Sequence, residues 1–113
     1  MTAPTSSEPG QPRPLAHAYI RAHLLMTENE LADVKERLAY YCHTEGLTLG
    51  KVFVERIDLA PAAYHALVDA LEHDDAHAVL VPSLHHLAVL GPPTVLRDHL
   101  QRVTGLNVVV AAP

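Results

Sequence analysis

One arginine and three histidines are the residues of this sequence whose types and spacing could carry chemistry. Arg21 and His23 follow a short apolar run, and His85 and His86 follow a second one. Three imidazoles and a guanidinium in one place could bind a divalent metal such as zinc, or an anion when the imidazoles are protonated. The alternative is that a loop tolerates these polar residues without any ligand.

Apolar periodicity predicts two strands and one helix in the first half of the chain. Residues 18–21 fit a short strand, and residues 52–54 fit a second one. Thr27 and Glu30 form a capping-box pattern before a helix that Gly46 would end. The apolar face of this helix is Leu31, Val34, Leu38 and Tyr41 or Cys42.

The second half of the chain continues the same alternation. Pro61 suits the first turn of a second helix. Its apolar face is Tyr64, Leu67, Val68 and Leu71. Residues 78–81 are a continuous apolar run, typical of a parallel strand that is covered on both faces. Pro92 and Pro93 precede a third helix, and residues 107–110 fit a last strand. We predict that four residues of the third helix face inward: Val95, Leu96, Leu100 and Val103.

Strands that alternate with helices predict an α/β fold with right-handed crossovers. The expected architecture is a three-layer αβα arrangement around a mainly parallel, four-stranded sheet. Residues 1–15 contain four of the nine prolines and little to bury, which predicts a disordered tail. The ordered domain is therefore expected over residues 16–113.

Composition excludes several classes of protein and site. A net charge of −5 disfavours DNA binding by this domain alone, because DNA-binding domains normally present a basic surface. The lone cysteine, Cys42, excludes an internal disulfide and a cysteine-based zinc site within one chain. No apolar run approaches the ~20 residues that span a bilayer, and no signal peptide opens the chain, so we expect a cytoplasmic protein without membrane contact.

The motif Tyr19-x-Arg21-x-His23 resembles the Tyr-x-Arg-x-Ser that opens the catalytic domain of serine recombinases (resolvases and invertases), in which the serine attacks DNA. The resemblance covers roughly residues 17–111. Residues 52–55 are similar to the family's Val-Phe-x-Asp/Glu, and residues 83–89 are similar to its Leu-Asp-Arg-Leu-x-Arg signature. The resemblance implies a flavodoxin-like strand order, 2-1-3-4. That order would bring the arginine and the three histidines into one crevice at the carboxyl ends of the strands.

Most catalytic groups of that family are missing. The serine position holds His23, the aspartate and first arginine of the later signature are His85 and His86, and its last arginine is replaced by an apolar residue. Only Arg21 and Glu55 keep their type. Several fixed guanidinium groups stabilise the charge that develops on phosphoryl oxygens. We therefore expect no enzymatic activity, and we interpret these five residues as vestigial positions of the family's site.

The leading functional hypothesis is a catalytically inactive, resolvase-like domain that acts as a protein-interaction or regulatory module, without a cofactor. It would bind a protein partner or associate with itself. One alternative is a small-ligand or metal sensor that uses the crevice, with His23, His85 and His86 as ligands. Another is a DNA-associated modulator of a full-length recombinase, which the acidic charge disfavours. A histidine nucleophile would need a second cation nearby, and Lys35 and Lys51 lie outside the crevice loops in this interpretation.

Other histidines and tyrosines have simpler interpretations. His73 and His77 have the spacing of two ligands on one helix face, but the two aspartates between them indicate a solvated turn. Four scattered histidines are expected to be surface or half-buried residues: His17, His43, His65 and His99. Tyr40 and Tyr41 could form an aromatic interface patch, with one ring in the core.

Overall fold

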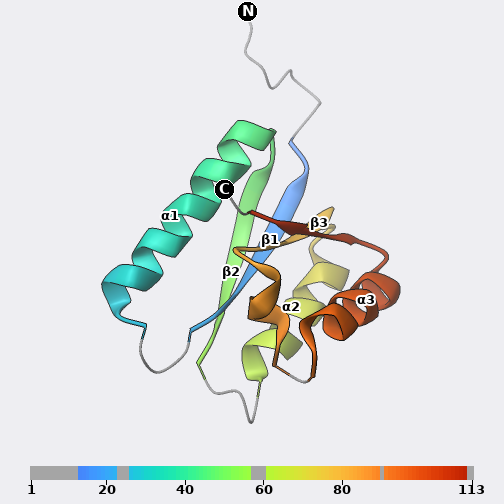
Figure 1. Ribbon diagram of the computed structural model, residues 1–113. Coiled ribbons are helices and arrows are strands. Elements are labelled where there is room, and N and C mark those ends of the chain that lie inside the picture. The colour runs from blue at the N-terminus through green and yellow to red at the C-terminus, as the bar shows by residue number, and fades with distance from the viewer. Residues whose placement is uncertain (1–12, 23–25, 57–60, 90, 112–113) are drawn as a thin grey trace, which may run out of the picture.

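The computed structural model describes residues 13–22, 26–56, 61–89 and 91–111, which form an alternating series of strands and helices (Figure 1). In chain order the elements are β1 (Leu15–Arg21), α1 (Glu28–Glu45), β2 (Thr48–Glu55), α2 (Ala62–His73), β3 (Ala78–Val81), the short 3₁₀ helix η1 (Leu84–Leu87), α3 (Pro93–Thr104) and β4 (Asn107–Val110). Within these described ranges, no helix combines the length and the hydropathy that a bilayer span requires.

The four strands form one sheet in which every neighbouring pair is parallel and the order is β2-β1-β3-β4. This confirms the α/β fold and the 2-1-3-4 order expected from the sequence. The bounds of β3 and β4 match the two predicted ranges, residues 78–81 and 107–110. In contrast, β1 begins at Leu15 rather than at residue 18, and β2 begins at Thr48 rather than at residue 52.

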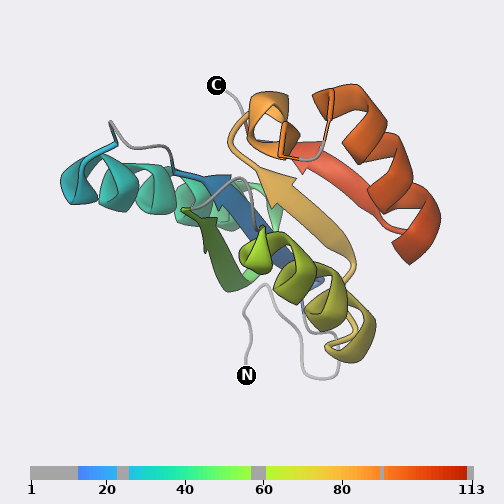
Figure 2. The ribbon, with the colours of Figure 1, turned by 90° about the horizontal axis from the view of Figure 1, so that it is seen from below.

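Helices cover both faces of the sheet, as Figures 1 and 2 show. Ala18 and Ile20 of β1 pack with α1, whereas Tyr19 between them packs with α2 and α3. Because side chains alternate along a strand, α1 lies on one face of the sheet, and α2 and α3 lie on the other. The buried helix residues are Leu31, Val34, Leu38 and Cys42 on the α1 side, and Tyr64, Leu67, Leu71, Leu96 and Leu100 on the other side.

The inward face of α3 is narrower than predicted. Leu96 and Leu100 are buried, but Val95 is 57% exposed and Val103 is 48% exposed. Val95 lies about 100° around the helix from Leu96, and Val103 lies in the last turn. The expectation that both valines face inward is therefore wrong, and the exposed side of α3 carries two apolar side chains.

Helix α1 begins and ends as predicted. The Thr27 hydroxyl accepts from the Glu30 backbone N–H at 3.1 Å, and the Thr27 N–H donates to the Glu30 carboxylate at 2.8 Å. Gly46 adopts the left-handed conformation (φ 74°) that favours glycine after a helix. Pro61 differs from its prediction, because it lies one residue before α2 and gives that helix no side-chain cap.

The pairing of β1 with β2 contains a β-bulge. Ala16 pairs with Leu49 and Ala18 pairs with Val52, so β2 has one residue more than β1 in this interval. The extra residue lies opposite His17, where β2 contains Gly50 and Lys51. The bulge interrupts the alternation of side chains along β2, which explains why the sequence predicted only the part of this strand that follows the bulge.

Candidate functional site at the carboxyl end of the sheet

Arg21 and His86 lie together at the carboxyl end of the sheet. Arg21 is the last residue of β1, and His86 belongs to η1, which follows β3. Strands β1 and β3 are hydrogen-bonded neighbours, and the Arg21 backbone N–H donates to His86 Nδ1 at 2.9 Å. Because Nδ1 accepts this bond, the neutral His86 ring carries its proton on Nε2. The two segments therefore meet at the switch point between β1 and β3, where ligands bind in sheets of this type.

A cleft of about 150 Å³ lies at this point and is lined by Arg21, Met26, His85 and His86. Three of the four residues predicted to share a crevice do so, and the fourth, His23, lies outside the described residues. The volume suits a small ion with a few waters and is smaller than the ~300–1,000 Å³ of pockets that hold drug-sized ligands. Met26 gave no signal in the sequence, because an apolar residue in a loop has no pattern that places it beside a cleft.

The described residues contain no group of three or more histidine, cysteine or acidic side chains that could hold a metal. The predicted set of His23, His85 and His86 includes a residue outside the described part of the chain. A metal site in the cleft therefore stays a prediction.

Glu55 is the last residue of β2, and its side chain contacts the start of α2 instead of lining the cleft. Its side chain is buried, and it accepts hydrogen bonds from the Tyr19 hydroxyl at 2.9 Å and from the backbone N–H groups of Tyr64 at 2.8 Å and Ala63 at 3.2 Å. The last two groups lie in the first turn of α2, where a negative charge also favours the helix dipole. Glu55 thus provides, from the neighbouring strand, the cap that Pro61 cannot provide. Sequence reasoning missed this role, although a proline before a helix signals that its cap must come from elsewhere.

Tyr19 and Tyr64 differ in how their hydroxyl groups are satisfied. The rings meet edge to face, with centroids 5.8 Å apart. The Tyr19 hydroxyl donates to Glu55, whereas the buried Tyr64 hydroxyl has no hydrogen-bond partner among the described residues. Burial raises the pKa of Tyr64 above its ordinary value. The Tyr64 hydroxyl therefore costs stability, and the Tyr19 hydroxyl contributes to it.

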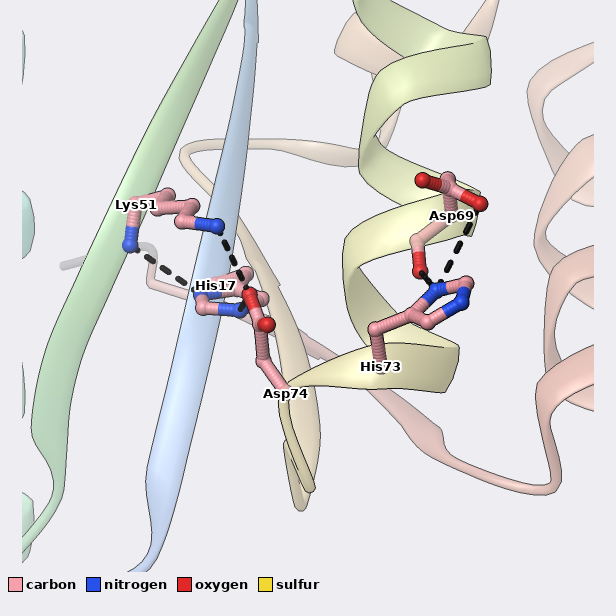
Figure 3. Close-up of polar contacts among 5 residues, drawn as sticks. All are labelled: His17, Lys51, Asp69, His73 and Asp74. Carbon is pink, nitrogen blue, oxygen red and sulfur yellow. Dashed lines mark hydrogen bonds and ion pairs between the residues drawn. The ribbon is translucent and has the colours of Figure 1, made fainter.

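A second polar cluster lies away from the cleft, around the β-bulge (Figure 3). The Lys51 backbone N–H donates to His17 Nδ1 at 3.0 Å, so the neutral ring carries its proton on Nε2, which lies 3.0 Å from Asp74 Oδ2. The Lys51 ammonium lies 2.9 Å from the same oxygen. Hydrogen bonds from Lys51 and then from His17 lower the pKa of Asp74. A Cβ added at Gly50 would lie 2.6 Å from His17 Nδ1, so the bulge needs glycine here.

This cluster corrects the interpretation of His17 as a surface or half-buried residue. The ring is 2% exposed, and both of its nitrogens are hydrogen-bonded. Because Asp74 follows α2 and precedes β3, the cluster lies at the amino end of the sheet, opposite the cleft. Through its two ring nitrogens, His17 of β1 is hydrogen-bonded to β2 on one side and to the α2–β3 turn on the other.

The remaining histidines lie on the surface. His73 is the last residue of α2 and His77 follows the turn, so the two do not share a helix face, as the aspartates between them indicated. His73 Nδ1 donates to the Asp69 carbonyl at 2.8 Å, and this bond together with the Asp69 charge raises the pKa of His73. The others predicted to be surface residues are exposed, namely His43, His65 and His99.

Two solved structures share this fold. The C-terminal catalytic domain of ISC1926 TnpA, an IS607-like serine recombinase, superposes with a TM-score of 0.64 at 16% identity, covering 88% of this chain and 69% of that chain. The C-terminal catalytic domain of IS1535 TnpA, also an IS607-like serine recombinase, gives a TM-score of 0.58 at 22% identity, covering 87% and 71%. No protein-family model and no curated protein matches the sequence. The chain therefore has the fold of a serine recombinase catalytic domain, as its motifs suggested.

Proposed function

We propose that this chain is a non-catalytic, resolvase-like domain that acts by binding protein, either a second copy of itself or another partner. The observation that carries the proposal is the make-up of the cleft. Arg21 is its only guanidinium among the described lining residues, and the remaining lining residues are Met26, His85 and His86. Strand exchange needs a nucleophile and several fixed cations around the phosphoryl group.

Two further features support the absence of catalysis. The sequence between Ala22 and Met26 is His-Leu-Leu, which contains no hydroxyl or thiol. Glu55 accepts three hydrogen bonds in the interior, so its carboxylate is committed to the start of α2. Two clusters of buried apolar side chains nevertheless pack the sheet against its helices, which fits a fold that is used for its surface.

A strand-transfer assay tests this proposal. The full chain is incubated with a supercoiled plasmid library of genomic fragments, and the products are examined for cleavage, recombination and covalent protein–DNA species. We expect none of the three. Strand transfer that disappears in a His23→Ala variant would show that the chain is an enzyme and that the proposal is wrong.

The cleft also supports a second candidate function, a sensor for a small anion or a metal. Arg21, His85 and His86 offer one permanent cation and two titratable rings around about 150 Å³. Titration calorimetry with zinc chloride and with inorganic phosphate would give a heat signal that a His85→Ala/His86→Ala variant loses. A His43→Ala/His65→Ala variant, which changes exposed histidines elsewhere, should bind like the wild type. No heat from either probe would exclude the sensor.

A further inference from the structure

An open groove of about 810 Å³ runs along the exposed side of α1. Its lining follows helical steps through Glu30, Asp33, Arg37 and Tyr40, with Met26 and Val34 as apolar parts of its floor. Tyr40 is 70% exposed, the largest exposure among the big apolar side chains described. Tyr41, by contrast, packs against the core, so one ring of the predicted aromatic patch is available for contact.

The groove carries a net negative charge. Its charged lining residues are Glu30, Asp33, Glu36 and Arg37, which sum to −2. Glu30 is occupied in the capping box, but Asp33 and Glu36 form no ion pair with any described residue. A partner surface that fits this groove therefore combines apolar side chains with a basic group.

The exposed side of α3 has this composition. Val95, His99 and Val103 follow one another at i, i+4 spacing, and Arg102 lies within the same arc. Arg102 contacts His99 at 3.4 Å, so its guanidinium lies over this stripe. The neighbouring Asp98 is paired with Arg97 at 3.1 Å, which leaves the stripe basic and apolar.

We propose that the α1 groove of one copy receives the exposed α3 stripe of a second copy, an inference that rests on the proposed protein-binding function. The two surfaces match in length, since Glu30 to Tyr40 spans about 15 Å and Val95 to Val103 about 12 Å of helix. Acidic residues of the groove meet Arg102, and the exposed ring of Tyr40 meets the valine stripe. The contact is small, so it is weak and depends on concentration.

The placement of the helices determines the symmetry of this association. Helix α1 lies on one face of the sheet and α3 on the other, at opposite sides of the molecule (Figures 1 and 2). A pair of copies joined through α1 and α3 leaves one unused groove and one unused stripe. The contact is therefore heterologous and leads to head-to-tail chains or rings, not to a closed two-fold dimer.

Sedimentation velocity of the full chain between about 10 µM and about 1 mM tests the inference. We expect the wild type to grow beyond dimers with concentration. Asp33→Arg/Glu36→Arg disables the groove and Arg102→Glu disables the stripe, so each variant alone is expected to be monomeric. The groove variant leaves out Glu30, because that residue caps α1. Circular dichroism melts confirm that each variant is folded.

Mixing the two variants gives the sharpest result. The groove variant keeps an intact stripe and the stripe variant keeps an intact groove, so a 1:1 mixture should form a heterodimer that grows no further. Charge-matched controls outside both surfaces, Glu45→Arg/Glu72→Arg and Lys35→Glu, should associate like the wild type.

Three results would overturn the inference: a wild type that stays monomeric, association that both variants leave intact, or a mixture that forms no heterodimer. Intact association in the variants would place the contact on another surface while the protein-binding proposal stands. Strand-transfer activity would overturn the proposed function without deciding which surfaces associate.

Discussion

The two buried tyrosines give a matched test of the polar network around Glu55. Replacement of Tyr19 by phenylalanine removes a hydrogen bond to a buried carboxylate and keeps the ring contact with Tyr64. Hydrogen bonds to charged groups contribute about 1.5–3 kcal/mol, so Tyr19→Phe should lower the free energy of unfolding by that amount. Replacement of Tyr64 by phenylalanine removes a buried hydroxyl that has no partner among the described residues. This change should leave stability within about 0.5 kcal/mol of the wild type or raise it.

Urea unfolding at pH 7, followed by circular dichroism, measures both variants. For a domain of this size each kcal/mol also shifts the melting temperature by roughly 4–8 °C, which gives an independent check. A double variant, Tyr19→Phe with Glu55→Gln, should lose less than the sum of the single changes, because Glu55→Gln weakens the same hydrogen bond that Tyr19→Phe removes. Equal destabilisation by Tyr19→Phe and Tyr64→Phe would refute the reasoning. It would mean that the hydrogen bond from Tyr19 to Glu55 makes no difference to the free energy of unfolding.

Three further predictions concern the bulge and the surface histidine. Gly50→Ala should destabilise the chain by about 1–3 kcal/mol in urea unfolding, because the added Cβ would clash with the His17 ring and with Leu15 Cδ1. A His17→Ala background should reduce that cost, because the two closest atoms belong to the ring. Asp74→Asn should lower the free energy of unfolding at neutral pH. The pKa of Asp74 in the folded chain is lowered from 3.8, so the ionised carboxylate stabilises the fold. The difference in unfolding free energy between variant and wild type should therefore persist above pH 3.8 and vanish as the pH falls through the lowered pKa. A difference that stays unchanged as the pH falls below 3.8 would contradict this. In NMR titration His73 should titrate above 6.5, and Asp69→Asn should lower its pKa only in part, because the carbonyl hydrogen bond is kept.

The sequence was sufficient for the fold class because the strands alternate with helices that each have their own apolar face. Strands β3 and β4 were predicted with correct bounds, since β3 is an uninterrupted apolar run and β4 is three valines in a row after Asn107. The first strand was predicted too short because His17 interrupts its pattern, and a histidine in a fully buried strand is stable only with partners that are distant in sequence. Those partners are Lys51 and Asp74, which lie 34 and 57 residues away.

The cleft was predictable in part for a related reason. The resemblance to serine recombinases implied that β1 and β3 are neighbours, and neighbouring parallel strands place the residues after their carboxyl ends side by side, so Arg21, His85 and His86 could be grouped from the sequence. Periodicity does not report the direction of a single side chain at a strand end. Glu55 was grouped with the same site from its motif, whereas its carboxylate caps the neighbouring helix.

The β-bulge also divides β2 into two halves that differ in phase. Leu49 and Val52 are three residues apart, yet both pack on the α1 side, and Phe53 packs on the other. The extra residue thus resets which sequence positions point to which layer, and Glu55 reaches α2 because of that reset. Loss of one residue at Gly50 would remove the bulge and leave Leu49 and Val52 in regular alternation, so Leu49 would still face α1 and Glu55 would still face α2. A one-residue deletion between Val52 and Glu55 would instead turn the Glu55 side chain to the α1 face and remove the cap of α2, so the strand tolerates a change of length at the bulge but not after it.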